Sequence, residues 1–248
     1  MLHPSKARVK TELARMARAT GRFDAERYFR GDHGLRFYNV GTDRMRALAK
    51  AIFKANQDRW TAADALAFAG TLVEDRYLET KSIGIEVLAL YKRALTPKML
   101  AHWKRWLARN YSSNWATTDA ICGMLIGPLL VRHPDRAREL RAWARHPNMW
   151  VRRASVVALI PLARRGLALD LLYDNARTLH GDPHDLIHKA VGWALREAGK
   201  ADMKRLERYL RDNGPSIPRT TVRYAIERFD ERTRRNLMIA TSAMVRVG

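Results

Sequence analysis

A short pattern, in which a charged residue precedes small and apolar residues, recurs five times along this chain. The charged residues are Lys81, Asp119, Arg153, Lys189 and Arg223. They are 38, 34, 36 and 34 residues apart, close to the repeat length of about 34 to 47 residues in proteins built from stacked helix pairs. A near-regular period predicts that the five positions are structurally equivalent. Four cations and one carboxylate should therefore line a single surface, and the carboxylate marks where chemistry should be sought.

Helical periodicity extends over nearly the whole sequence. Met45, Leu48, Ala49, Ile52 and Phe53, for example, fall on one face of a helix. No comparably persistent alternation indicates strands, so the predicted fold class is all-α. Besides helices beginning near residues 97 and 183, the periodic stretches cover residues 5–19, 43–56, 61–74, 78–93, 114–132, 135–145, 148–164, 168–179, 202–212 and 218–229.

Prolines mark several of the expected boundaries. Thr96-Pro97 and Asp182-Pro183 each place a capping side chain before a proline that suits the first turn of a helix. Pro128 and Pro161 lie inside helical patterns, which they should kink or end. Such bends would curve the second helix of a pair around a concave surface.

The chain is predicted to form one helical-repeat domain over residues 1–248. Residues 1–40 should form an N-terminal cap and an aromatic loop, because the segment from Asp24 to Val40 breaks the periodicity and is rich in Tyr and Phe. Residues 43–230 should form the repeat array, and residues 231–248 a C-terminal tail. No low-complexity stretch or long linker divides the sequence.

Charge indicates the partner. Lys and Arg number 46 against 25 Asp and Glu, which gives a net charge of +21, far more than solubility requires. A polyanion is therefore expected. The longest apolar run, Ala120 to Val131, is too short to span a membrane, and no signal peptide is indicated at the start. A single cysteine, Cys122, allows no internal disulfide and fits a reducing cytoplasm.

Two aromatic residues lie at helical spacing from members of the repeated pattern. Trp115 precedes Asp119 by four residues, which places an indole and a carboxylate on one helix face, and Trp193 follows Lys189 by four. Indoles and a carboxylate beside a bound nucleic-acid backbone could stabilise an oxocarbenium-like transition state. One carboxylate could suffice for a purine alkylated at N3 or N7, because this base is already cationic and leaves as a neutral molecule.

Three motifs carry a resemblance to a known family: Trp115-x-x-x-Asp119, Trp150-Val151-Arg152-Arg153-Ala154-Ser155, and Lys189-Ala190-Val191-Gly192-Trp193-Ala194-Leu195-Arg196-Glu197. At these residues the chain resembles the AlkD-type alkylpurine DNA glycosylases, which are built from HEAT-like helical repeats. The resemblance spans roughly residues 24 to 229. It implies an all-α, HEAT-like helical-repeat solenoid with a basic concave face.

The resemblance also implies roles for individual residues. The positions matching Trp115, Asp119 and Trp193 form the catalytic cleft, and the position matching Arg153 assists by holding a DNA phosphate. Arg27-Tyr28-Phe29-Arg30 resembles an N-terminal motif whose tyrosine approaches the lesion. Together with the repeated cations, this gives the expected DNA-binding set: Tyr28, Lys81, Arg152, Lys189 and Arg223.

The implied activity is that of a DNA N-glycosylase in base excision repair, which removes N3-methyladenine and N7-methylguanine type lesions from duplex DNA. The family acts without enclosing the base in a pocket, unlike enzymes that flip the damaged nucleotide. No metal, small-molecule cofactor or membrane is expected. The expected state is a monomer in the cytoplasm, associated with the nucleoid through DNA.

Other interpretations of the same residues stay open. The whole chain could be a non-catalytic repeat module that binds damaged or branched nucleic acid, or a scaffold that binds proteins. Trp115 and Asp119 alone would also fit a core indole and a capping or salt-bridged carboxylate. His184 and His188 have a spacing that can bind metal, but a third ligand at motif spacing is missing.

Overall fold

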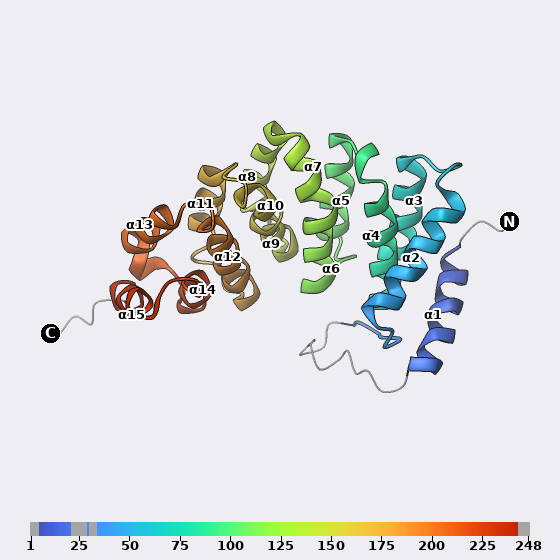
Figure 1. Ribbon diagram of the computed structural model, residues 1–248, viewed down its shortest axis with the longest axis horizontal. Helices are drawn as coiled ribbons and strands as arrows, with labels where there is room; N and C mark the ends of the chain where they lie inside the picture. Colours follow the sequence, from blue (N-terminus) through green and yellow to red (C-terminus); the bar gives the residue numbers. More distant parts are fainter. Residues whose placement is uncertain (1–4, 21–28, 30–33, 243–248) are drawn as a thin grey trace. The chain divides into compact units, whose positions relative to one another are not determined.

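The computed structural model describes residues 5–20, 29 and 34–242, except for the side chains of residues 18–20. The described residues are predominantly helical, as Figure 1 shows, and they contain no β-strand. An isolated bridge between Arg36 and Tyr77 is their only β-type pairing. The prediction of an all-α fold is therefore confirmed.

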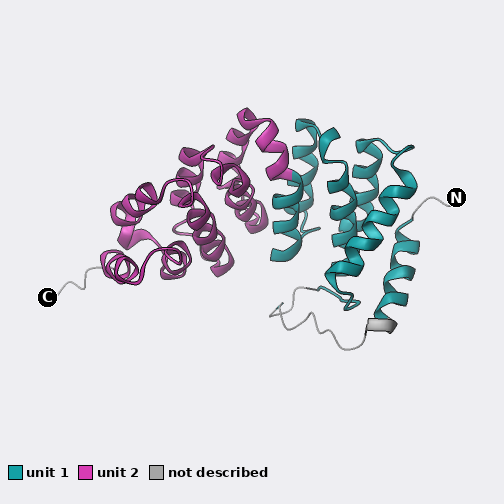
Figure 2. Ribbon diagram, in the orientation of Figure 1, with its two compact units in different colours: residues 1–125 teal, residues 126–248 magenta. Residues whose placement is uncertain are grey.

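Residue contacts divide the chain into two compact units, residues 1–125 and 126–248 (Figure 2), where the sequence predicted one domain. The α-helices of the first unit are α1 (Lys6–Thr20), α2 (Thr42–Asn56), α3 (Ala62–Val73), α4 (Leu78–Leu90), α5 (Leu100–Ala108) and α6 (Trp115–Ala120). Those of the second are α7 (Gly127–Arg132), α8 (Leu140–Trp143), α9 (Met149–Val157), α10 (Ile160–Ala163), α11 (Leu169–Thr178), α12 (Asp185–Ala198), α13 (Met203–Asn213), α14 (Arg219–Ala225) and α15 (Glu231–Ala240). A π-helical segment, Ile121–Ile126, follows α6, and short 3-10 helices cover Lys92–Ala94, Pro97–Met99, Pro134–Glu139 and Gly214–Ser216.

The repeated sequence pattern corresponds to a repeated place in the fold. In the first unit α4 packs against α2, α3 and α6, and in the second α12 packs against α9, α11 and α14. Helices α4, α6, α9, α12 and α14 carry the five charged positions. Each position lies three or four residues after the first residue of its helix, as the period predicts.

The prolines act at helix boundaries. A 3-10 helix begins at Pro97, and α9 ends before Pro161, which occupies the first turn of α10. The start predicted near residue 183 is found at Asp185, because the Asp182 carboxylate accepts a hydrogen bond from the His184 N–H (3.0 Å) and holds the preceding residues in a turn. Pro128 lies in the first turn of α7, directly after the π-helical segment.

The segment after α1 includes an extended loop that docks on the start of α4. Within residues 34–40, the Tyr38 ring stacks on the Tyr77 ring at 4.0 Å between centroids. The buried Glu79 carboxylate accepts hydrogen bonds from the N–H groups of Tyr38 (3.1 Å) and Val40 (3.3 Å). These contacts fix the loop against the first turn of α4.

Part of the segment predicted as a C-terminal tail is helical. Residues 231–240 form α15, which packs on α13, starts with an Asp230 side-chain cap and buries Leu237. The sequence conceals this helix because residues 231–236 are all polar, so an apolar stripe is confined to its last turn. Residues 243–248 lie outside the described residues.

The approach of α12 to α14 leaves no room for a side chain at Gly192. A Cβ there would lie 2.5 Å from the Tyr224 Cβ and 2.7 Å from the Thr221 carbonyl oxygen. We predict that Gly192→Ala lowers the free energy of unfolding by about 1 to 3 kcal/mol, since one helix must move away from the other. Urea denaturation measures this. Gly123→Ala is the matched control, because nothing lies within 4 Å of its Cβ; equal stabilities of the two variants would contradict the prediction.

Candidate functional site

Buried polar side chains fix the start of α6. The Asn114 carboxamide oxygen accepts a hydrogen bond from the Thr117 N–H (2.9 Å), and its NH2 group donates to the Thr117 hydroxyl (2.8 Å). The Ser112 hydroxyl lies 2.7 Å from the same hydroxyl, and the Thr118 hydroxyl donates to the Ser112 carbonyl oxygen (2.9 Å). These groups satisfy one another away from water, so the first turn of α6 has one well-defined geometry.

Trp115 begins α6 and is exposed. Its side chain is 38% exposed, so the alternative of a core indole is wrong. The Phe29 ring stacks on the indole at 5.3 Å between centroids with 16° between the planes. Asp119 lies one helical turn further along α6 and is half-buried. The structure thus brings together on one helix the indole and the carboxylate that the sequence paired.

A cavity of about 320 Å³ lies beside Trp115, within the first unit. Its walls are largely apolar, with the carboxylates of Glu79 and Glu86 among them. The apolar lining side chains include Phe29, Val40, Leu78, Ile85 and Met124. Phe29 therefore contributes both to this cavity and to the surface of Trp115. The sequence placed Phe29 in an aromatic segment beside Tyr28 but did not predict this role.

Lys81, predicted to bind DNA, has an internal role in the structure. It is only 5% exposed, and its ammonium donates hydrogen bonds to the carbonyl oxygens of Val73 (2.7 Å) and Tyr111 (2.6 Å). Burial lowers the pKa of this ammonium to about 8. The side chain thereby joins the end of α3 to the loop before α6. A DNA phosphate could reach it only if these contacts were broken.

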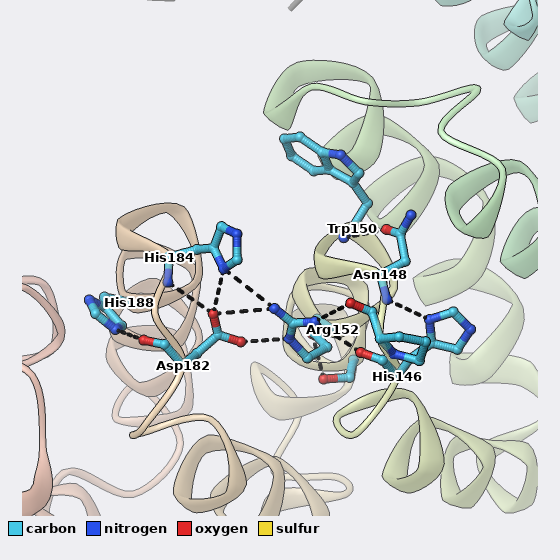
Figure 3. A network of polar contacts seen from close by, with 9 residues as sticks. His146, Asn148, Trp150, Arg152, Asp182, His184 and His188 are labelled. Carbon is cyan, nitrogen blue, oxygen red and sulfur yellow. Dashed lines mark hydrogen bonds and ion pairs between the residues drawn. The ribbon is translucent and has the colours of Figure 1, made fainter.

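Arg152, also predicted to bind DNA, is held inside a polar network (Figure 3). Its Nε and Nη2 donate to the two Asp182 carboxylate oxygens (2.6 and 3.4 Å), and its Nη1 donates to the carbonyl oxygens of His146 (3.0 Å) and Pro147 (2.7 Å). Nη2 also lies 3.4 Å from His184 Nδ1. This guanidinium is therefore already engaged by protein groups on both of its sides.

The other end of the network is Asp182, whose side chain is only 3% exposed. Burial by itself would raise the pKa of Asp182, but hydrogen bonds from Arg152 and from the His184 N–H and ring hold that pKa below its usual value. His188 Nε2 lies 2.6 Å from the Asp182 carbonyl oxygen. Both histidines that were considered as metal ligands thus contact this one aspartate.

The remaining candidates of the second unit differ in exposure. Arg153 is 5% exposed and its Nη1 donates to the carbonyl oxygen of Leu186, in the first turn of α12. Trp193 is half-buried on α12, and Lys189 is half-buried and paired with Asp185 (2.7 Å). Arg223 on α14 is exposed and forms no ion pair with any described residue. The five equivalent positions are therefore not a uniform row of exposed charges.

The structure divides the predicted site residues between the two units. Trp115, Asp119 and Lys81 belong to the first. The second contains Arg152, Arg153, Lys189, Trp193 and Arg223. Tyr28 lies outside the described residues.

The sequence matches a family model described as DNA alkylation repair enzyme over residues 9–229. The chain belongs to this family. The resemblance carried by the motifs around Trp115, Arg153 and Trp193 is thus confirmed at the level of the DNA alkylation repair family. The family is described as repairing alkylation of DNA.

Comparison with solved structures supports the fold. The chain is similar to a predicted DNA alkylation repair enzyme from Enterococcus faecalis, with a TM-score of 0.71 and 18% identity over 80% of this chain and 91% of that one. At this identity the likeness shows a shared helical-repeat fold. No curated protein matches the sequence. Within the described parts of the chain, no helix has the length and apolar character needed to cross a membrane.

The buried ammonium of Lys81 should give the protein a measurable pH dependence. Burial lowers its pKa from 10.5 to about 8 in the folded protein, so between these pH values the unfolded chain binds a proton that the folded chain does not. The free energy of unfolding should therefore rise by about 3 kcal/mol from pH 8 to pH 10.5, relative to the Lys81→Met variant.

Urea titrations of both proteins across this pH range make the measurement. Lys98→Met removes an exposed lysine and serves as the control, and it should follow the parent. If the free energy of unfolding changes with pH equally in the parent and in Lys81→Met, the lysine keeps an ordinary pKa in the folded protein.

Proposed function

We propose that this member of the DNA alkylation repair family is a DNA glycosylase that hydrolyses the N-glycosidic bond of cationic alkylated purines in duplex DNA. The proposal depends on α6, where an exposed indole and a carboxylate lie one turn apart. Phe29 stacks on the indole and orients it. A net charge of +21 supports a polyanionic substrate.

The proposed reaction needs little acid catalysis. As the C1′–N bond breaks, the departing purine takes the bonding electron pair and its positive charge is cancelled, so it leaves as a neutral base. Positive charge develops on the sugar instead. The Asp119 carboxylate would stabilise that charge, and Trp115 would add an attraction of about 0.5 to 2 kcal/mol through its ring face. Both interactions strengthen towards the transition state, which is the condition for acceleration.

Water completes the reaction at C1′. Asp119 would orient the attacking water and accept its proton, which then passes to solvent. We assign no step to a metal or cofactor. Recognition would depend on the lability of the cationic base and on contacts to the backbone and sugar, so the base need not enter a closed pocket.

Residues of the second unit receive supporting roles. We assign Trp193 as a second indole for the sugar cation, and Lys189 and Arg223 as phosphate contacts. Arg152 and Arg153 already donate to protein groups, so we assign them to the support of α12 instead. Tyr28 stays a proposed contact to the lesion.

Asp119→Asn tests the mechanism. The variant should release N3-methyladenine or N7-methylguanine from methylated duplex DNA about 100-fold more slowly or worse, because the carboxylate charge acts mainly in the transition state, while duplex affinity should change by no more than about threefold. Single-turnover base release and binding titrations measure the two quantities. Asp58→Asn, at an exposed position after α2, is the control for loss of one negative charge.

Two results would count against the proposal. If the parent protein binds methylated duplex but releases no base, the non-catalytic binding module is the correct interpretation. If Asp119→Asn loses affinity and turnover equally, Asp119 is a structural residue.

Arg223→Gln tests the DNA-binding surface. Loss of one phosphate contact should reduce the slope of log affinity against log salt by about 1. Arg208→Gln on α13 removes the same charge from another exposed position. It therefore shows how much of the change in slope comes from the lower net charge and not from a lost phosphate contact. Equal slopes for the two variants would exclude Arg223 from the phosphate contacts. Fluorescence anisotropy with labelled duplex at several salt concentrations provides the data.

A further inference from the structure

Two consecutive arginines of α9 reach the beginning of α12. Arg152 extends to Asp182, three residues before the helix starts, and Arg153 donates to the carbonyl oxygen of Leu186 in its first turn. The sequence suggested phosphate contacts for both. In the structure both arginines donate hydrogen bonds at the junction between neighbouring repeats, and Figure 3 shows those of Arg152.

Asp182 is the buried centre of this junction. Its carboxylate accepts hydrogen bonds from Arg152 Nε (2.6 Å) and from the His184 N–H (3.0 Å). The same carboxylate lies 3.1 Å from Nδ1 of the His184 ring. Its carbonyl oxygen lies 2.6 Å from His188 Nε2. Asp182 thus contacts Arg152 of α9, His184 at the N-cap position of α12 and His188 in the first turn of α12.

The same Arg152 side chain fixes the start of its own helix. It donates to the carbonyl oxygens of His146 and Pro147, which immediately precede α9. Asn148 then caps α9 by accepting a hydrogen bond from the Trp150 N–H (2.8 Å). The guanidinium therefore links the beginning of α9 to the beginning of α12 through a short, rigid fork.

The position of this link matters because the helix that it anchors carries Lys189 in its second turn and Trp193 in its third. A shift of about 1 Å in a substrate-positioning element can slow a reaction about 100-fold. Buried ion pairs contribute little net stability compared with apolar packing, and their best-supported use is to fix one arrangement among several. A link at the start of α12 is well placed to do this.

We propose that Asp182 is a positioning residue, which acts through Arg152 to hold the first turns of α12 against α9 and so sets where Lys189 and Trp193 present themselves to DNA. The effect on base release rests on the proposed glycosylase function. The effect on α12 itself does not, and the two can be measured separately.

Glu197 offers a matched comparison. Its carboxylate, also 3% exposed, accepts a hydrogen bond from Arg164 Nε (2.7 Å) and so ties the end of α10 to the last turn of α12. It is thus a second inter-repeat ion pair on the same helix, at the opposite end from Asp182. Its arginine is more exposed than Arg152 (48% against 14%), and Lys200 pairs with the same carboxylate. Asp182→Asn and Glu197→Gln remove comparable charges, and only the first loosens the start of the helix.

The first experiment measures hydrogen exchange in the full-length chain. Asp182→Asn should speed amide exchange about tenfold in peptides covering residues 184–190 and leave residues 203–213 unchanged, because opening is local. Glu197→Gln should leave residues 184–190 protected. Exchange that is unchanged at 184–190 in Asp182→Asn, or raised throughout the unit, would overturn the proposal.

The second experiment measures base release from methylated duplex under single-turnover conditions. Asp182→Asn should lower the rate about tenfold with less than about a threefold change in duplex affinity, in keeping with the loss of a residue that supports a functional group. Glu197→Gln should retain the parent rate. Equal rates for the two variants would show that Asp182 contributes stability alone.

A milder variant guards against unfolding. Arg152→Lys keeps a cation beside Asp182 but cannot donate to the carboxylate and to both loop carbonyls together, so its exchange and release rates should fall between those of the parent and Asp182→Asn. Parent-like values for a folded Arg152→Lys would also overturn the proposal. If the parent releases no base, the glycosylase function fails, and the exchange data still decide whether Asp182 positions α12.

Discussion

Close packing between neighbouring helices is the constraint on which the rest of the structure depends. A single helix pair of this size cannot bury its own apolar face, so stability requires each repeat to lie directly against the next. At Gly192 the approach of α12 to α14 is so tight that a methyl group does not fit. Because α12 also packs against α9 and α11, only part of its surface faces solvent, and the partly exposed Lys189 and Trp193 lie on that part.

This packing also decides what the charged residues do. A cation at a junction between repeats must find acceptors there, since an unpaired buried charge is too costly. Lys81 and Arg153 therefore donate to carbonyl oxygens, and Arg152 to Asp182 and loop carbonyls. The charge available for an anionic partner is thus smaller than a count of lysines and arginines implies, which is why we propose phosphate contacts for exposed cations such as Arg223.

Sequence periodicity predicted most of the helices, which follow from local spacing, and the equivalence of the five positions, which follows from the period of 34 to 38 residues. It could not predict exposure at those positions. One of the two acceptors of Lys81, at Tyr111, lies 30 residues away, and that of Arg153, at Leu186, lies 33 residues away, so no local pattern predicts these contacts. The stacking of Phe29 on Trp115 is equally non-local. Helix α15 was not predicted because its apolar residues are confined to its last turn, so its sequence shows little helical periodicity. Packing against α13 stabilises this helix instead.

The exposure of Trp115 is informative in a chain that buries other indoles well. Trp103 and Trp106, in the same unit, are almost wholly buried, so an indole left in contact with solvent gives up hydrophobic stabilisation. Stacking on Phe29 recovers part of that loss and fixes the ring, while the buried Asn114 cap fixes the backbone beneath it. In the glycosylase reaction that we propose, a ring and a carboxylate already in place would need no reorganisation as positive charge develops on the sugar, and electrostatic catalysis depends on such preorganisation.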